Sequence, residues 1–541
     1  MKKTMKQYSF TARLKSVAVV FGIAMAFASC ANEDVAQNPT NPNEDNDKNL
    51  TTFVAGDETK TRTSMDYTTG DFYWEAGDYI YVKDDNNVWR KSSNAPTGKV
   101  ASFKFKVPGK FTASASYKVY YPGKNGSNDQ VTIPAAQSQS EPNSTAHFGE
   151  SGDCRTADAT GTVGGGSFSF ALDHQAAILV LQPYNPNATL NDCYLTKVEV
   201  TSDNNITGTY TLDPSSGELT GTGTGKQIVV TTSGSSTSPN GFPIKKVASV
   251  TDNSAYVLIK PGTHTLTVKY TLKDIATNVE GTITKTLSAF NYDKNTYYDM
   301  TANLDIKDYD GDHYYMWDAQ QDYWHGYESE QPSINKGQPG ATQGLNYPKN
   351  NSDPKNRWYN EDYPGHGIQN DAQTNLFKTF PNINELCWYV MKGDPHWGSK
   401  IYVENGHLKK FDGLWLRKKS AIVTYLKAYE GYPSSFTEDD LKSGYKASFT
   451  AFLNDYRITN GTVSATPASG VPTNIADYFF LPASGYYFEG WLVKSGFSGY
   501  YWTSSGHPWA ANLAYNLVFT PTLVRTANDY RNVGHSSWPS E

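Results

Sequence analysis

Residues 265–272 alternate between polar and apolar side chains, and this pattern constrains the fold more than any other feature. Leu266, Val268, Tyr270 and Leu272 are separated by threonine and lysine residues. A period of two places one face of a β-strand against a core and the other face in water. The pattern therefore predicts a half-buried strand.

Two further segments also favour β-structure. Phe103, Phe105 and Val107 alternate with lysine residues, which again gives a period of two. Residues 177–181 (AILVL) form a continuous apolar run, which suits a strand buried on both faces. Since no segment of helical period competes between residues 167 and 307, we expect two successive β-sandwich-like domains.

The chain has 541 residues, which is too long for one core, so two or three domains are expected. The three glycines at 164–166 break the strand pattern and are a plausible domain junction. Composition shifts again at Asp308, after which Asp, Tyr, Gln, Asn, Pro and Gly dominate. The expected divisions are a signal peptide (1–30), a flexible tether (31–50), an N-terminal β-domain (51–163), a second β-domain (164–307), a linker or extended loop (308–355) and an α+β domain (356–541).

Helix signals occur in the last of these regions. Residues 381–386 (PNINEL) resemble a helix start with proline in the first turn. Residues 437–440 (TEDD) are a possible variant of the capping box, although Asp is a weaker partner there than Glu. Short strands rich in glycine and aromatic residues follow, so a mixed α+β domain is expected.

The N-terminus predicts export. Basic residues precede an apolar stretch at 17–27, which is too short to span a bilayer and suits a signal peptide. The stretch ends in FASC at 27–30, which resembles a lipobox, whose cysteine (Cys30) receives a diacylglyceryl group. The polar tether that follows suits a lipoprotein exposed on the cell outer membrane. The other interpretation is an ordinary signal peptide that happens to contain a cysteine.

Composition excludes several classes of partner. The net charge of −7 is mild and is not segregated along the chain, so nucleic acid is not an expected partner. No second apolar run approaches membrane-spanning length. Abundant Gly, Asn, Ser, Thr and Tyr favour a β-rich extracellular protein.

Cysteine and histidine spacing predicts neither a metal site nor a cofactor. If Cys30 is lipidated, then Cys154, Cys193 and Cys387 remain, and a Cys154–Cys193 disulfide is the pairing we consider. The chain has no CxxC, HxH or HExxH spacing, and the acidic segment that starts at Asp308 departs from the EF-hand pattern. Nucleophile elbows and phosphate loops are also absent, so we do not expect an enzyme.

Three motifs in the first half of the chain resemble a known family. They are TRT at 61–63, WEAGDYIYV at 74–82 and FALDHQAAI at 170–178. Together with the lipobox and in this order, they resemble the fimbrillin-like proteins of Bacteroidetes, over about residues 30–307. The resemblance implies two β-sandwich-like domains and assembly into a type V pilus.

The same resemblance implies a mechanism of assembly. A trypsin-like protease cuts after an arginine, the first strand leaves, and a strand from a neighbouring subunit fills the groove. In this chain the removable strand would lie near residues 49–55, with cleavage between Arg62 and Thr63. Such strand addition is physically sound, because a sandwich that lacks a strand exposes apolar side chains and unpaired backbone amides. Arg62 could instead be an ordinary surface arginine.

The last region resembles a second family, the Fibrobacter succinogenes major-paralogue domain. Six ordered blocks carry the resemblance, namely FPNINELCWY (380–389), GDPHW (393–397), GLW (413–415), FLPASGY (480–486), GYYWTSS (499–505) and AYNLVF (514–519). The resemblance implies a C-type-lectin-like fold. The chain closes with SSWP at 536–539 instead of the usual Ser-Val-Arg run.

Aromatic residues are the remaining signal for binding, with 12 Trp and 38 Tyr in the chain. Exposed rings can stack on the apolar faces of sugars. The weak candidates, which flank loop-like Gly, Ser and Pro residues, are Trp397, Tyr487, Trp491 and Trp509. For each of them, packing in the core is the alternative. Four others, within the recurring blocks, are expected to be core residues: Trp388, Trp415, Trp502 and Tyr515.

These observations predict a pilus tip or accessory subunit that acts as an adhesin toward a host or bacterial glycan or protein. A shaft subunit must donate its own C-terminal strand, whereas residues 297–306 run on into some 235 further residues. A surface lipoprotein that stays anchored through Cys30 and never polymerises is the main alternative. A third possibility is an anchor subunit that keeps its N-terminal strand and lipid.

Overall fold

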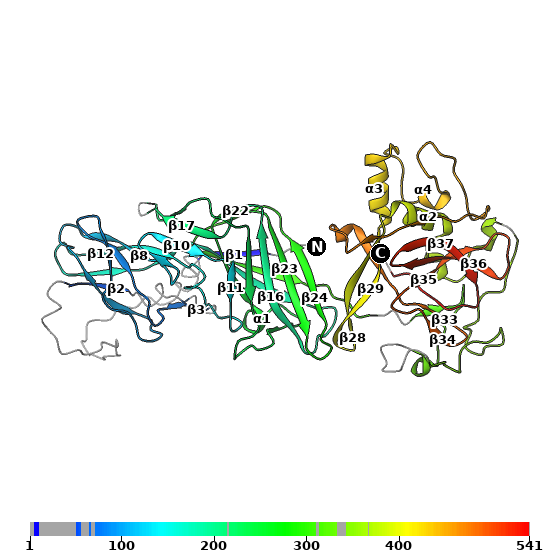
Figure 1. Ribbon diagram of the computed structural model, residues 1–541, viewed down its shortest axis with the longest axis horizontal. Helices are drawn as coiled ribbons and strands as arrows, with labels where there is room; N and C mark the ends of the chain where they lie inside the picture. The colour runs from blue at the N-terminus through cyan, green and yellow to red at the C-terminus, as the bar shows by residue number, and fades with distance from the viewer. Residues whose placement is uncertain are drawn as a thin grey trace, which may run out of the picture. The chain divides into compact units, whose positions relative to one another are not determined.

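The computed structural model describes residues 5–9, 50–55, 64–66, 71–213, 216–309, 313–332, 342–365 and 367–539. The chain forms two compact units (Figure 1). The first comprises Met1–Lys307 with Val403–Leu408, and the second comprises Asp308–Tyr402 with Lys409–Glu541. The prediction of a mostly β protein is confirmed, since strands far outnumber helices among the described residues.

The first unit opens with an eight-stranded sheet, and the apolar side chains of this sheet form a core of their own. In spatial order its strands are β6 (Trp89–Lys91), β5 (Tyr81–Lys83), β8 (Ser116–Tyr121), β12 (Arg155–Gly161), β13 (Ser167–Phe170), β2 (Leu50–Ala55) and β7 (Phe103–Pro108), with β14 (Asp173–His174) paired to β12. A short hairpin of β3 (Ser64–Asp66) and β4 (Asp71–Tyr73) precedes β5.

The rest of the first unit contains three larger sheets and a two-stranded ribbon. One sheet has the order β18 (Leu219–Thr220), β17 (Gly208–Leu212), β10 (Gln130–Ile133) and β9 (Gly126–Ser127). A second has β11 (Ala136–Ser138), β19 (Gln227–Thr231), β16 (Cys193–Ser202), β23 (Leu266–Asp274) and β24 (Glu280–Thr286), with β20 (Phe242–Pro243) paired to β16. A third has β1 (Met5–Ser9), β26 (Thr296–Asn303), β15 (Ala177–Tyr184) and β21 (Ala255–Ile259). The ribbon pairs β22 (Gly262–His264) with β25 (Phe290–Tyr292), and the single helical turn is α1 (Val250–Asn253).

Two strands follow from the sequence pattern in the expected way. The apolar run at 177–181 lies in β15, between β26 and β21, and all five side chains are fully buried. In β23 the four apolar residues that alternate with threonine and lysine are all buried. A strand buried on both faces needs a continuous run of apolar residues. A strand with one face in solvent needs apolar and polar residues in alternation.

The three glycines expected to form a domain junction lie instead in the turn of a hairpin between β12 and β13. Gly164 and Gly166 have φ values of +69° and +70°, which residues with a side chain rarely adopt. Phe168 and Phe170 of β13 pack in the same core as β2 and β12. The glycines therefore reverse the chain within one sheet.

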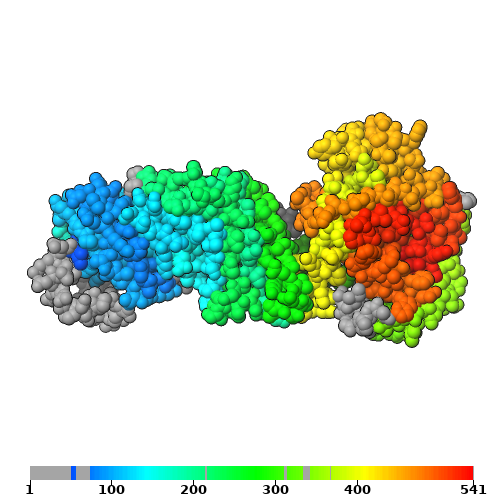
Figure 2. All heavy atoms as spheres, viewed as in Figure 1, coloured from blue at the N-terminus to red at the C-terminus, as the bar shows by residue number. Residues whose placement is uncertain are grey.

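The second unit combines strands with three helices. Its larger sheet has the order β27 (Tyr314–Tyr315), β38 (His535–Ser536), β35 (Gly499–Gly506), β36 (Leu513–Thr520), β37 (Leu523–Tyr530) and β30 (Ser464–Ala465). A smaller sheet has the order β31 (Ala468–Ser469), β28 (His396–Glu404), β29 (His407–Arg417) and β32 (Tyr478–Pro482). A separate hairpin pairs β33 (Tyr486–Phe488) with β34 (Trp491–Val493). The helices are α2 (Ile383–Lys392), α3 (Lys419–Tyr429) and α4 (Asp440–Ser443). The part of the surface that contains α3 and α4, yellow to orange, projects at the top of the second unit in Figure 2.

Capping explains where α2 starts, whereas the N-cap residue of α4, Asp439, forms no side-chain cap hydrogen bond. Asn382 caps α2, since its side chain accepts a hydrogen bond from the Glu385 backbone and Glu385 accepts one from the Asn382 backbone in return. This is a full capping box, and the expected first-turn proline, Pro381, lies one residue before the cap. In the shorter α4, the Asp440 carboxylate accepts hydrogen bonds from the backbone and hydroxyl of Thr437.

The region expected to be a linker or an extended loop, 308–355, packs into the second unit in its described parts. Trp317 and Trp324 are buried, and the Trp317 indole donates to the Thr503 backbone oxygen at 3.0 Å. The Tyr314 hydroxyl donates to the Ser484 oxygen at 2.7 Å. The burial of these residues was not predicted, because the apolar residues here are scattered among polar ones and show no strand or helix period.

Candidate functional site

The first strand after the N-terminal segment, β2, lies in the interior of its sheet. It runs parallel to β13 over four residue pairs and antiparallel to β7 over six. Phe53 and Ala55 are fully buried. The Phe53 ring stacks on Phe168 at 5.3 Å and contacts Phe111 edge-on at 5.1 Å. The sheet and its core are therefore complete only while β2 is in place.

Removal of β2 would leave two unpaired strand edges and an apolar groove. Burial of a phenylalanine side chain contributes about 1.5–3 kcal/mol, and each backbone group without a hydrogen bond adds a penalty. Thr52, for example, donates its backbone N–H to the Gly166 oxygen at 3.0 Å. A sheet that lacks β2 would thus bind a replacement strand strongly.

The predicted processing and lipidation residues lie outside the described residues. These are Arg62, Thr63 and Cys30, and their predicted roles stay predictions. The described chain resumes at β3, which starts at Ser64, directly after the predicted cleavage point. The strand expected near residues 49–55 is present as β2, so the segment that separates it from β3 holds the arginine.

The last strand of the first unit, β26, lies between β15 and β1, and it would become an edge strand paired with β15 alone once the predicted signal peptide, which contains β1, is removed. It runs parallel to β15 over eight residue pairs, and six of its eight residues are buried. On its other edge it pairs antiparallel with β1, whose residues belong to the predicted signal peptide. β26 cannot leave its sheet without the loss of eight paired residues and their buried side chains.

The four candidate aromatic residues lie in different environments. Tyr487 is 1% exposed and donates its hydroxyl to the Pro332 oxygen, so its expected role in stacking on a sugar is wrong. Trp397 is half-buried against the core of the second unit, with its ring 6.3 Å from that of Phe519. Trp491 and Trp509 are 40% and 57% exposed. Two of the four therefore present their rings to solvent.

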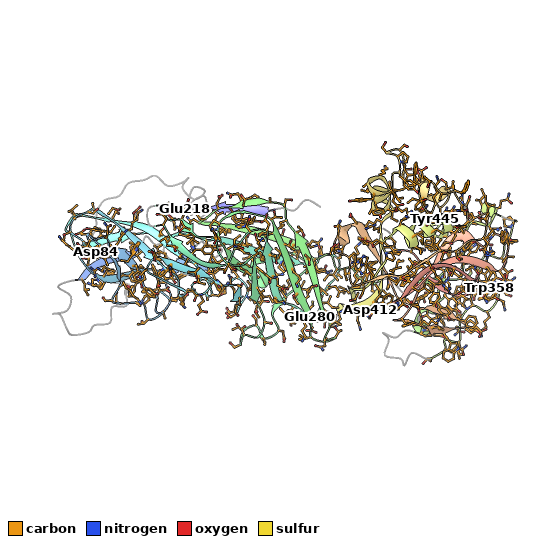
Figure 3. The ribbon with its side chains drawn as sticks, turned by 45° about the horizontal axis from the view of Figure 1, so that its top comes forward. Asp84, Glu218, Glu280, Trp358, Asp412 and Tyr445 are labelled. Atoms are coloured by element: carbon orange, nitrogen blue, oxygen red, sulfur yellow. The ribbon has the colours of Figure 1, made fainter. Side chains whose placement is uncertain are left out.

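The four aromatic residues expected in the core are confirmed as core residues. Trp388, Trp415, Trp502 and Tyr515 are all buried. Trp388 packs edge-on against Tyr445, labelled in Figure 3, at 5.0 Å between ring centroids. These residues hold the second unit together and are not available to a ligand.

Sequence reasoning missed several exposed apolar side chains in the second unit. The loop after α4 exposes Phe449, Phe452 and Leu453, with Phe452 93% exposed. In the β33–β34 hairpin, Phe488 is 43% exposed beside Trp491. The signal that could have found Phe488 is the Glu-Gly turn at 489–490, because aromatic residues on both sides of a two-residue turn face each other across a hairpin.

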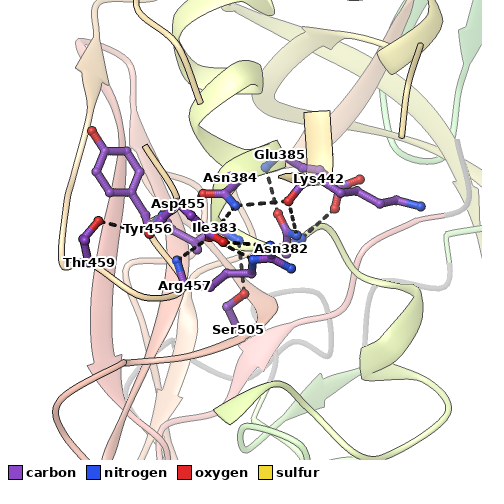
Figure 4. A network of polar contacts seen from close by, with 10 residues as sticks. All are labelled: Asn382, Ile383, Asn384, Glu385, Lys442, Asp455, Tyr456, Arg457, Thr459 and Ser505. Carbon is purple, nitrogen blue, oxygen red and sulfur yellow. Dashed lines mark hydrogen bonds and ion pairs between the residues drawn. The ribbon is translucent and has the colours of Figure 1, made fainter. Parts of the chain in front are cut away.

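A network of polar contacts connects α2 to two loops of the second unit (Figure 4). Asn382 and Asn384 both donate to the Lys442 backbone oxygen, at 3.0 and 3.1 Å. Asn384 also donates to Asp455 at 2.8 Å, and Asp455 accepts two hydrogen bonds from the Arg457 guanidinium and one from its backbone N–H. Because these groups satisfy one another, the recurring motif around α2 has a structural role.

Two clusters of buried charge stabilise the first unit. Asp153 accepts hydrogen bonds from His174 Nδ1 at 2.7 Å and from Arg155 Nε at 3.0 Å, and all three residues are buried. Burial and the nearby Arg155 charge lower the pKa of His174. Asp84, labelled in Figure 3, accepts from Arg90 and from two backbone amides of the β5–β6 turn.

The cysteines of the described chain are free thiols. Cys154, Cys193 and Cys387 are all buried, so the disulfide considered between Cys154 and Cys193 is absent, and burial raises the pKa of each thiol. No cluster of three or more metal-binding side chains occurs within the described ranges. Among those same residues, no helix is long and apolar enough to cross a membrane.

No family model matches the sequence. No curated protein matches it either. Among solved structures, a candidate cell adhesion protein from Bacteroides ovatus ATCC 8483 is similar at 14% identity and a TM-score of 0.31, over 47% of this chain and 93% of that one. A fimbrial protein from the same strain is similar over 90% and 98% of the two chains, at 10% identity and a TM-score of 0.26.

The fimbrial anchor protein Mfa2 from Porphyromonas gingivalis is also similar. It has 11% identity and a TM-score of 0.21, over 43% of this chain and 80% of that one. At these values the three structures do not assign the chain to a family.

Proposed function

We propose that the chain is a cell-surface adhesin that becomes the tip or an accessory subunit of a fimbria. It is exported as a lipoprotein through Cys30, reaches the outer membrane, and is cut between Arg62 and Thr63. Cleavage releases β2, and a strand from a neighbouring subunit takes its place between β13 and β7. The observation that carries the proposal is the interior position of β2, an N-terminal strand that is followed by the arginine-containing segment.

The position of β26 supports a subunit that accepts a strand and donates none. A donor strand must leave its own subunit, but β26 is paired along its length with β15 and its chain continues into the second unit. A subunit of this kind ends a filament. Its second unit would then face a host or bacterial surface, where it contacts a glycan or a protein.

The first experiment is to determine the N-terminus of the protein recovered from the cell surface, by mass spectrometry. We expect wild type to start at Thr63 without lipid. We expect Arg62→Ala to retain the diacylated Cys30, while the matched variant Lys60→Ala is processed like wild type. A wild-type protein that keeps its diacylated Cys30 would overturn the tip assignment and leave the anchored, non-polymerising lipoprotein or the anchor subunit.

A second experiment tests the groove itself. A peptide of residues 49–55 is added to protein that starts at Thr63, and binding is measured by fluorescence polarisation. We expect the peptide to bind, because it restores the two strand ladders and the buried Phe53. The same peptide with Phe53→Asp should bind at least about ten-fold more weakly, since it would bury a charge. Equal binding of the two peptides would exclude the groove as the acceptor.

A further inference from the structure

The β33–β34 hairpin of the second unit presents two aromatic rings beside its turn. Phe488 and Trp491 are directly opposite each other across the hairpin, so their Cβ atoms are about 4.5–5.5 Å apart. The turn residues Glu489 and Gly490 have φ values of 48° and 78°, as in a type I′ turn. The rings are 43% and 40% exposed and lie on one face of the hairpin.

Stabilisation of the hairpin does not explain this exposure. Aromatic pairs that stabilise hairpins do so by packing against each other, with ring centroids 4.5–7 Å apart as a rule. In the described part of the chain, neither ring contacts another aromatic ring or a cation. Part of each side chain is therefore open to solvent and accessible to a ligand.

The hairpin is held rigidly from behind. Tyr487, whose side chain points the other way, is buried, and its backbone N–H and C=O each form a 2.8 Å hydrogen bond with Gly534. The Gly490 oxygen accepts a hydrogen bond from the Gly344 N–H at 2.9 Å. Binding to such a surface costs little conformational entropy of the protein, because the rings are already positioned.

Polar groups lie next to the rings on the same face. The next residue of β33 that points this way is Tyr486, whose ring is 4.6 Å from that of Tyr500. Lys494 donates to the Tyr500 hydroxyl at 3.3 Å. Asp529, with 31% of its side chain exposed, is paired with His535, and the His535 ring is 6.0 Å from that of Tyr486. These groups gather around Tyr486, next along β33 from Phe488; Tyr500 is buried, whereas Lys494 is exposed and Asp529 is partly exposed.

We propose that this surface, the aromatic platform, binds a neutral pyranose of a cell-surface glycan; this inference rests on the proposed adhesin function. The C–H face of the sugar ring stacks on Trp491 and Phe488. Its hydroxyls exchange hydrogen bonds with Lys494 and Asp529. The aromatic platform is defined by Phe488, Trp491, Tyr486, Lys494 and Asp529.

Charge and size select the class of ligand. Lys494 and Asp529 cancel each other, and Glu489 at the turn adds a negative charge, which disfavours sialylated or sulfated sugars. The few residues of this surface are far fewer than the roughly 20–30 that each partner contributes to a stable protein interface. A sugar fits these limits, because it needs one or two ring faces and a few hydrogen bonds.

The experiment uses a glycan array of neutral and acidic oligosaccharides, probed with the mature chain. We expect wild type to bind neutral glycans. Trp491→Ala and Phe488→Ala should each weaken binding about ten-fold or more, as aromatic residues at binding hot spots do. Phe452→Ala is the matched control, since Phe452 is also an exposed aromatic residue of the second unit, and it should bind like wild type. Unchanged thermal unfolding confirms that the variants fold.

Loss of binding in Phe452→Ala but not in Trp491→Ala would overturn the inference, and so would a wild-type protein that binds a protein partner and no glycan. Adherence of whole cells separates this failure from failure of the proposed function. If deletion of the chain abolishes adherence but Trp491→Ala does not, the aromatic platform is wrong and the adhesin stands. If deletion leaves adherence unchanged, the proposed function fails.

Discussion

His174 is buried beside a carboxylate and a guanidinium, and these neighbours decide its charge. Asp153 accepts its Nδ1–H, while burial and the Arg155 charge keep the ring neutral by lowering its pKa. A neutral histidine in the fold takes up a proton when the chain unfolds below its ordinary pKa of about 6.5. The stabilising effect is therefore complete above that pH and is lost as the pH falls toward the lower pKa of the folded state.

We predict that the free energy of unfolding of the first unit decreases from pH 7 to pH 5 and that His174→Gln makes this decrease shallower. Burial also lowers the pKa values of His147 and His264. Part of the pH-dependent loss of stability should therefore remain in His174→Gln. Urea unfolding, followed by circular dichroism at pH 7, 6 and 5, measures the free energy of unfolding at each pH. His313→Gln, at an exposed position, is the control. Parallel pH curves for His174→Gln and wild type would contradict the prediction.

At the scale of single elements, the β33–β34 hairpin depends on a glycine in its turn. A Cβ atom at Gly490 would lie 2.2 Å from the Gly344 oxygen and 2.8 Å from the Tyr347 ring, at a φ of +78°. Gly496, with a φ of +80°, has open space around it. The two positions therefore separate backbone strain from steric overlap.

We predict that Gly496→Ala costs about 1 kcal/mol of stability, which is the penalty for a left-handed backbone. Gly490→Ala should cost about 1–3 kcal/mol more, because the neighbouring chain must move. Thermal unfolding of both variants measures the difference. Equal losses of stability in the two variants would mean that the segment around Gly344 moves aside without a cost in free energy.

The sequence predicted the regular elements better than the surfaces. The strands β15 and β23 and the helix α2 were found because a strand period, an apolar run and a capping residue are local signals. The packing of Trp317 and Trp324 was missed, since their partners are distant in sequence. Among the candidate site residues, Tyr487 and Trp491 are separated by four positions but lie on opposite faces of the hairpin. Which face is buried depends on tertiary contacts that no local pattern encodes.

At the scale of the whole molecule, a chain that accepts a strand but donates none ends a filament. We predict that immunogold labelling with antibody against the second unit marks fimbrial ends and leaves the shafts unlabelled. A strain that lacks the chain is the control for antibody specificity. Gold particles at regular intervals along the shafts would show that the chain is an ordinary shaft subunit and that β26 or another strand can be donated.

The neighbours of β2 also determine how an incoming strand is selected. Because β2 is parallel to β13 and antiparallel to β7, those two strands run in opposite directions. A strand that fills the gap therefore has one parallel and one antiparallel neighbour whichever end enters first. Backbone pairing in the gap therefore does not select the direction of the incoming strand. Side-chain fit must select it, with a large ring where Phe53 lies and a methyl-sized group where Ala55 lies.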